Sequence, residues 1–211
     1  EKLRLRLVPF VGIKEYLKKA LPFFWTEAFG VAKQESITLI IGAFMGLRDV
    51  AVYDLANKIV SIPRIMTSKI NGAIFPQLIQ NPQISTIKKI IRAESLIGTG
   101  IIALIASFGY WIVLLLGGEP LIDAYPIAVI LSVTITTSLI VGGFINFVFI
   151  PSGNYYAVTQ SQLVGFTSFL GIGLSVLVFW NSIFAVVIAM ALSGIMETAY
   201  SVHCIKKYNL L

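Results

Sequence analysis

The sequence has few of the groups that carry enzyme or metal chemistry. Only one of its 211 residues is cysteine (Cys204) and only one is histidine (His203). A single thiol excludes an internal disulfide, and one thiol with one imidazole cannot form a metal cage of such ligands. Paired carboxylates in a polar loop, a nucleophile beside a base and a glycine-rich phosphate loop are also lacking. We therefore expect no enzyme activity, no metal and no cofactor.

Charged residues are scarce as well. They make up 12% of the chain, whereas 57% of the residues are hydrophobic and the mean hydropathy is +0.88. Residues 124–196 contain no Asp, Glu, Lys, Arg or His, and such a stretch is long enough for three helical crossings of about 20 to 25 residues each. This composition excludes a soluble core, and it makes a nucleic-acid partner unexpected despite the net charge of +6. We expect an all-α integral membrane protein.

Six apolar stretches are separated by short connections rich in turn residues or charges. The expected transmembrane spans are about 21–45, 50–78, 93–116, 124–150, 155–180 and 183–202. Residues 1–19 mix basic and apolar side chains and predict an interfacial lead-in to a six-helix lobe over residues 20–211. The chain has neither an initial Met nor a signal peptide, so we expect it to be a fragment of a longer protein.

The basic residues outside the spans predict the orientation of the chain. Six crossings place both termini on one side of the membrane. The only basic residue on the other side is Arg48, whereas the terminal side carries Lys2, Arg4, Arg6, Lys14, Lys18, Lys19, Lys88, Lys89, Arg92, Lys206 and Lys207. Because Lys and Arg accumulate in cytoplasmic loops, we expect both termini in the cytoplasm.

The first two spans contain ionisable residues, whose cost at the bilayer centre is about 2.5 to 3.5 kcal/mol each. Such residues normally face a partner or a water-filled cavity. The residues predicted to line a substrate cavity are Lys33, Asn57, Lys58, Arg64 and Lys69. The acids predicted to pair with these bases or to bind a coupling cation are Glu27, Glu35 and Asp54. Glu94 and Glu197, which we place near the cytoplasmic ends of their spans, receive no functional role.

Two interpretations of these charges are open. In the first, they form a ladder of salt bridges that only joins the two helices, with Asp54 pairing with Lys58 one turn later. In the second, they line a polar cavity through which a hydrophilic, anionic molecule crosses the membrane. Four bases against three acids leave at least one cation without an acidic partner in these helices, and Arg64, at mid-depth, is the least able to reach the headgroups.

Three short stretches of the first two spans carry a family resemblance. They are IIGAFMG at residues 40–46, VYDLANKI at residues 52–59 and FPQ at residues 75–77. Together with two polar helices followed by four apolar ones, they resemble the seventh and eighth helices of the multidrug/oligosaccharidyl-lipid/polysaccharide exporter superfamily. The closest similarity is to its bacterial polysaccharide transporters, the O-antigen flippases.

The resemblance implies that the chain is one lobe, the C-terminal half, of a twelve-helix transporter with two lobes. Such a transporter flips an undecaprenyl-diphosphate-linked oligosaccharide across the bacterial inner membrane by alternating access, for O-antigen and lipopolysaccharide synthesis. The implied partners are this lipid-linked oligosaccharide, membrane lipids, and the other six-helix lobe or a second copy. A cation-coupled multidrug exporter of the same superfamily and a nontransporting membrane scaffold of a polysaccharide-synthesis complex remain open as alternatives.

Overall fold

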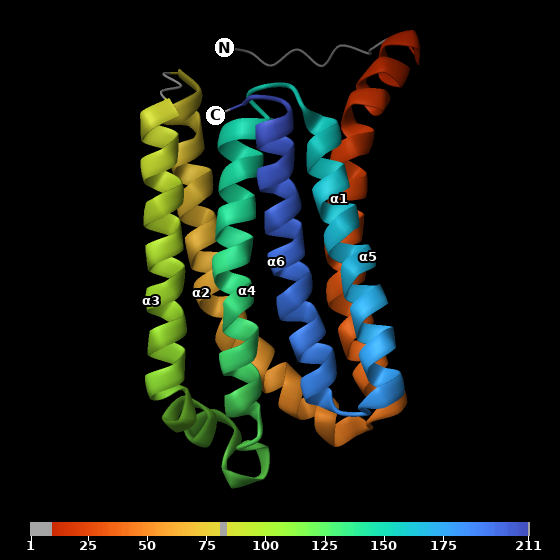
Figure 1. Cartoon of the computed structure of the whole chain (residues 1–211), viewed down its shortest axis with the longest axis vertical. Coiled ribbons are helices and arrows are strands. Elements are labelled where there is room, and N and C mark those ends of the chain that lie inside the picture. The colour runs from red at the N-terminus through yellow and green to blue at the C-terminus, as the bar shows by residue number, and fades with distance from the viewer. Residues whose placement is uncertain (1–9, 81–83, 211) are drawn as a thin grey trace, which may run out of the picture.

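The structure, a computed structural model, describes residues 10–80 and 84–210, which form a bundle of six long α-helices (Figure 1). A short 3-10 helix, η1 (Glu119–Leu121), precedes the fourth helix, and a π-helical segment, η2 (Ile145–Phe149), extends it. The long helices are α1 (Phe10–Phe44), α2 (Leu47–Gln80), α3 (Ile84–Gly117), α4 (Ala124–Phe144), α5 (Tyr155–Phe179) and α6 (Ile183–Lys207). The expected all-α membrane bundle is confirmed.

Each expected span corresponds to one helix, and the differences lie at the helix ends. α1 begins at Phe10, so the second half of the expected lead-in continues into the helix without a break; residues 1–9 lie outside the described residues. α3 begins at Ile84 and α6 ends at Lys207, both beyond the expected spans. Hydropathy marks the part of a helix that suits lipid, whereas basic residues continue a helix readily, so the apolar run underestimates its length.

Four of the helices are long and apolar enough to cross a membrane by themselves: α3, α4 with η2, α5 and α6. α1 and α2 are not in this set, and they carry the ionisable residues singled out above. Their length is similar, and they lie alongside the apolar helices (Figure 1). The crossing of the membrane by α1 and α2 therefore remains a prediction that rests on this packing.

The helices run alternately up and down. α3, α4, α6 and α5 form a row, in which each helix packs on the next, while α2 packs mainly on α4 and α1 mainly on α5 (Figure 1). The α1–α2, α3–α4 and α5–α6 connections lie at one end of the bundle, here called the loop end. The end of α2, the start of α3, the α4–α5 connection and the end of α6 lie at the other end, and this is called the terminal end.

The short connections have local causes. Gly46, between α1 and α2, has a φ of 106°, a conformation in which a side chain would be strained, and its N–H bonds to the carbonyl of Ile41. Asn154 and Ser182 cap α5 and α6, since their side chains accept hydrogen bonds from the backbone of Ala157 and Phe184. The turn residues identified in the sequence therefore fix where the helices begin and end.

The buried side chains form two apolar clusters. The larger lies toward the loop end and includes Ile37 of α1, Val60 of α2 and Ile135 of α4; the smaller lies toward the terminal end and includes Phe147 and Ile205. A layer of polar side chains separates the two clusters along the helices. We call it the polar layer, and its members are Lys33, Arg64, Asn71, Glu94, Ser138, Gln162 and Glu197.

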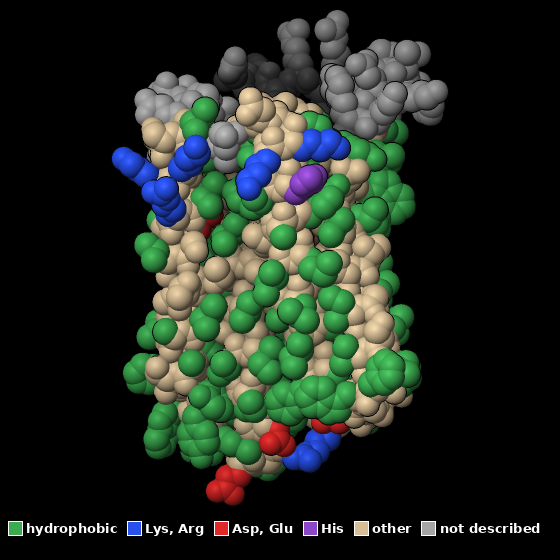
Figure 2. Space-filling view, in the orientation of Figure 1, with side chains coloured by type: hydrophobic (Ala, Val, Ile, Leu, Met, Phe, Trp, Pro, Cys, Tyr) green, Lys and Arg blue, Asp and Glu red, His purple; other side chains and the backbone are tan. Residues whose placement is uncertain are grey.

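The face of the bundle that Figure 2 shows has a wide apolar belt with charges at both ends. Exposed Lys88, Lys89 and Arg92 lie near the start of α3, and Lys206 and Lys207 lie at the end of α6, so all five are near the terminal end. Arg48 and the acid Asp123 lie at the loop end, where Arg48 Nη2 is 3.2 Å from the Asp123 carboxylate. Within the described residues, the two ends therefore differ in charge as the sequence predicts.

Candidate functional site

A buried ion pair joins α1 to α6 within the polar layer. Lys33 Nζ lies 3.4 Å from Glu197 Oε2, and each residue is 8% exposed. The amide of Gln162 on α5 donates a 2.8 Å hydrogen bond to the other carboxylate oxygen, Oε1. Three helices therefore meet at one carboxylate, whose charge is balanced and whose two oxygens are both bonded.

Glu197 fits between α5 and α6 because α5 has a glycine at this place. A Cβ at Gly165 would overlap the Glu197 carboxylate. Gly194 on α6 stands in the same relation to Thr137 on α4, whose Oγ1 would be 2.7 Å from an added Cβ. Small residues let membrane helices approach closely, and in this bundle they also leave niches for polar side chains of the neighbouring helix.

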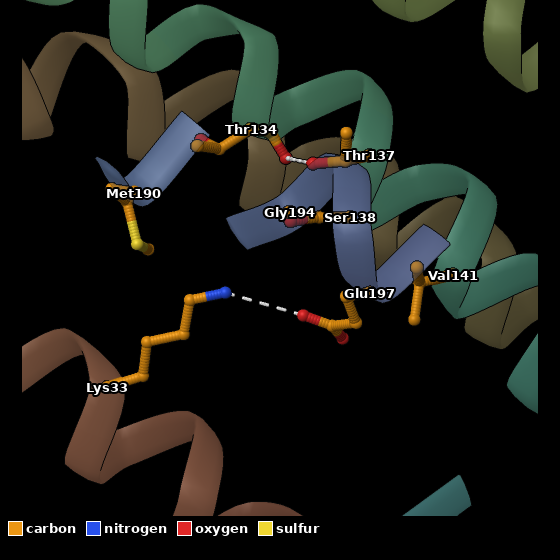
Figure 3. A pocket seen from close by; sticks show the side chains of 8 residues that line it. All are labelled: Lys33, Thr134, Thr137, Ser138, Val141, Met190, Gly194 and Glu197. Carbon is orange, nitrogen blue, oxygen red and sulfur yellow. Dashed lines mark hydrogen bonds and ion pairs between the residues drawn. The ribbon is translucent and has the colours of Figure 1, made fainter. Parts of the chain in front are cut away.

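The ion pair borders a cavity of about 220 Å³ between α1, α2 and the row of α4, α6 and α5. In an adjoining space of about 40 Å³, Lys33 reaches from α1 toward Glu197, while Thr137 and Ser138 extend from α4 (Figure 3). Since a water molecule occupies about 30 Å³, the larger cavity has room for several. Its lining residues are Gly30, Lys33, Gln34, Arg64, Ser138, Val141, Gly142, Ile145, Gln162, Met190 and Glu197.

Arg64 is the cation that α2 contributes to this cavity. It is half-buried and also lines a neighbouring cavity of about 70 Å³, together with Ser138 and Asn146. In contrast to Lys33, it forms no ion pair with a carboxylate of the described residues. The planar guanidinium can bind a phosphate group through two parallel hydrogen bonds. The cavity therefore contains one paired cation and one whose charge is not compensated by a neighbouring acid.

The remaining predicted site residues lie elsewhere on α1 and α2. Five charged residues are exposed, and none of them forms an ion pair with a described residue. These five are Glu27, Glu35, Asp54, Lys58 and Lys69, while Asn57 is half-buried. The structure therefore brings only Lys33 and Arg64 of the predicted set to the cavity, and it does not form the pair between Asp54 and Lys58.

Glu197 and Gln162 are central to the site, although the sequence patterns assign neither of them a role. We placed Glu197 near a span end without a role, whereas the structure shows it buried within α6, which continues to Lys207. Ten residues of helix, or about 15 Å at 1.5 Å per residue, separate Glu197 from that end. The available signal was that Glu197 is the first charged residue after the uncharged stretch 124–196 and that an apolar helix continues on both sides of it.

The chemistry available at this site is that of binding. Across residues 10–80 and 84–210, no three His, Cys, Asp or Glu side chains lie close enough together to hold a metal ion. The cavity presents a guanidinium, an ammonium–carboxylate pair, amides and a hydroxyl. These groups can bind an anion and the hydroxyl groups of a polar molecule.

An apolar helical bundle with a charged cavity of about 220 Å³ between its apolar clusters defines a membrane protein with a polar interior site. The chain belongs to the family of polysaccharide biosynthesis proteins, whose sequence profile matches residues 2–126. This match covers more than half of the chain, and it includes α1 and α2 with Lys33 and Arg64. No curated protein matches the chain, and no solved structure does.

Proposed function

We propose that the chain is one six-helix lobe of a flippase, and not an enzyme. Its proposed substrate is an undecaprenyl-diphosphate-linked oligosaccharide, which crosses the bacterial inner membrane by alternating access for O-antigen or related polysaccharide synthesis. Membership of the polysaccharide biosynthesis family supports the pathway. The cavity between α1, α2 and the α4–α6–α5 row supports a transport role, because it gives a polar group a place inside an apolar bundle.

Arg64 is the observation that carries this proposal. A free cation inside a membrane protein is costly, so an arginine without a carboxylate partner indicates an anionic ligand. A diphosphate matches the fork of guanidinium donors, and it is the charged part of a lipid-linked sugar. Gln34, Ser138 and Gln162 line the same cavity and offer hydrogen bonds to sugar hydroxyls.

The uneven charge of the two ends supports a cytoplasmic position for both termini. The exposed basic residues of the α2–α3 region and of the end of α6 lie at the terminal end, and Lys and Arg accumulate on the cytoplasmic side. Arg64 and the terminal end are then connected by α2, along which a substrate from the cytoplasmic leaflet would approach.

The exposed charges of α1 and α2 support a partner lobe. Glu35, Asp54 and Lys58 lie within the predicted spans yet are exposed on the six-helix bundle, and such residues do not normally face lipid. We propose that a second six-helix lobe faces α1 and α2 and encloses the transport pathway with them. This lobe would belong either to the same full-length polypeptide or to a second copy.

The test combines accessibility with export in bacterial cells that make the full-length protein. Single cysteines replace Lys33, Arg64 and Lys58 in a Cys204→Ala background and are exposed to a membrane-impermeant thiol reagent. We expect labelling at position 64, and loss of most surface polysaccharide in Arg64→Ala with partial recovery in Arg64→Lys. The matched control is Arg48→Ala, which removes an exposed arginine at the loop end and should leave export unchanged.

Two other functions predict different outcomes. A drug exporter is favoured by the exposed acids Glu27, Glu35 and Asp54, and in that case their amide variants would reduce drug resistance while Arg64→Ala would not. A scaffold is favoured by the closed Lys33–Glu197 pair, and in that case position 64 would not label although the protein inserts. Normal polysaccharide export by a well-inserted Arg64→Ala variant would contradict the flippase.

A further inference from the structure

Glu94 is a second buried carboxylate, on α3, away from the Lys33–Glu197 pair. It is 5% exposed and lies between Ile87 and Ile105, which belong to the two apolar clusters. Because α3 begins at Ile84, Glu94 lies about 15 Å along the helix at 1.5 Å per residue. The expected span 93–116 placed Glu94 at the start of its helix, which was wrong, and its position needs another explanation.

The carboxylate of Glu94 has no hydrogen-bond partner. It lies against Gly143 of α4, where an added Cβ would be 2.5 Å from Oε2. Within the described residues, neither Oε1 nor Oε2 accepts a hydrogen bond. The side chain of Asn71 on α2 faces the carboxylate, but it does not form a hydrogen bond of good geometry with either oxygen. Glu94, Asn71 and Thr67 line one cavity of about 50 Å³.

No charged side chain of the described residues neutralises Glu94. α4 contains no Asp, Glu, Lys, Arg or His, and α2 contributes Arg64, two turns before Asn71, and the exposed Lys69. On α3 itself, Arg92 and the nearby lysines are exposed. Neither ion pair of the described chain includes Glu94. An ionised carboxylate buried without a partner costs several kcal/mol, so this group must bind a cation from outside the chain.

We propose that Glu94 is a binding site for a monovalent cation, either a proton or Na⁺, between α2, α3 and α4. Its carboxylate is the primary ligand, and the amide oxygen of Asn71 and the hydroxyl oxygen of Thr67 are supporting ligands. The Thr67 hydroxyl already donates to the carbonyls of Pro63 and Arg64, at 2.9 and 3.0 Å, so its oxygen remains available as an acceptor. The cavity has the volume of about one or two water molecules.

The cation site adjoins the substrate cavity through shared residues. Arg64 and Ser138 line both the cavity of about 220 Å³ and the one of about 70 Å³. Asn71 and Leu139 line both the latter and the cavity of about 50 Å³ at Glu94. The cavity at Glu94 therefore borders a cavity that Arg64 lines. Its role as the coupling ion rests on the proposed flippase function, whereas the binding itself does not.

Infrared spectroscopy of the purified full-length protein in lipid nanodiscs tests the binding. The spectrum of Glu94→Gln is subtracted from that of the unsubstituted protein while pH is varied, first in choline chloride and then in NaCl. We expect a carboxylic-acid C=O band that disappears as pH rises in choline, and the matched variant Glu119→Gln, at an exposed position, should retain it. Loss of the band in NaCl at constant pH identifies Na⁺ as a second ligand, and insensitivity to NaCl identifies the proton alone.

Two further variants distinguish a site from a buried acid that merely stays protonated. Asn71→Leu removes a supporting ligand and should weaken cation binding about tenfold, as loss of a supporting group does at ion sites. Gly143→Ala displaces the carboxylate without removing it and should shift the band.

Identical spectra of the unsubstituted protein and a folded Glu94→Gln variant at every pH and salt would overturn the proposal. A band that no pH or cation alters would overturn it as well. Because polysaccharide export does not enter these measurements, they remain decisive if the flippase assignment fails.

Discussion

The two buried carboxylates of the polar layer differ in their partners and not in their burial. Glu197 is 8% exposed and Glu94 is 5% exposed, and each lies against a glycine of the neighbouring helix. Glu197 has a lysine at 3.4 Å and an amide at 2.8 Å, whereas Glu94 has no bonded partner in the described chain. Similar niches therefore hold one carboxylate that is internally satisfied and one that depends on a ligand.

The difference follows from the helices that face each carboxylate. Glu197 faces α1, one of the two polar helices, which supplies Lys33. Glu94 faces α4, which has no acidic or basic residue, and the part of α2 that carries Asn71. A fixed countercharge on another helix holds the two helices together. A buried carboxylate without one is unfavourable when ionised, and a cation that binds and dissociates can provide the missing charge. We therefore expect the Glu197 region to stabilise the fold and the Glu94 region to respond to solution conditions.

Removal of the fixed countercharge should have the largest effect. Lys33→Ala leaves Glu197 buried without its cation, and we expect a loss of about 3 kcal/mol in the free energy of unfolding. That value is at the low end for a broken buried pair, because the adjoining cavity admits water. Thermal unfolding of the purified protein measures the loss. In the double variant Lys33→Ala/Glu197→Gln most of the stability should return, and no recovery would show that Lys33 acts by packing alone.

Closing the niche of Glu197 should have the next largest effect. Gly165→Ala places a methyl group against the carboxylate, and we expect a loss of about 1 to 3 kcal/mol, as for other overpacked sites. The control is Gly171→Ala on the same helix, where an added Cβ meets no atom within 4 Å. Equal stability of the two variants in thermal unfolding would mean that α5 and α6 separate freely at this depth.

Neutralising Glu94 should change stability little. Glu94→Gln removes a charge that the chain itself does not balance, so we expect a change of less than about 1 kcal/mol at neutral pH, in either direction. Unfolding of the variant should also lose the dependence on pH that a titrating carboxyl gives the unsubstituted protein. A loss as large as that of Lys33→Ala would show that Glu94 has a fixed partner after all.

The exposed ion pair should have the smallest effect. Arg48, in the first turn of α2, pairs with Asp123, which directly precedes α4, and their side chains are 74% and 59% exposed. Exposed pairs contribute about 0 to 1 kcal/mol, and salt screens them. Arg48→Ala should therefore unfold within about 1 kcal/mol of the unsubstituted protein, and the difference should vanish at high salt. A greater loss would mean that charge pairing outside the polar layer also matters.

The sequence predicts most of the fold because the bilayer restricts the choice. Long apolar runs must be helical when no water satisfies the backbone, and the residues around Gly46, Asn154 and Ser182 mark the breaks between helices. The ends of α1 and α6 lie outside the apolar runs, so hydropathy could not locate them. The basic ends of the spans continue as helix into the interface.

The site is only partly predictable, since burial of a charge depends on contacts between distant helices. Lys33 and Arg64 stand out because a cation in an apolar run requires an explanation. The partner of Lys33 is 164 residues away, and nothing local to Glu197 indicates which helix will face it. The exposure of Lys58 and Asp54 could not be predicted from the sequence either. It follows from the packing of α2 on α4, which leaves the other side of α2 uncovered.

The glycine niches also have an evolutionary consequence. A glutamate at position 197 leaves room only for glycine at position 165. A glutamate at position 94 likewise leaves room only for glycine at position 143. Neither member of a couple can then be replaced by a larger residue while the other stays as it is. Across related sequences, therefore, positions 165 and 197 should change together, as should positions 143 and 94. In a lineage that has lost one of these acids, the opposing glycine is no longer constrained. Both substitutions should then be found together in the sequences of that lineage.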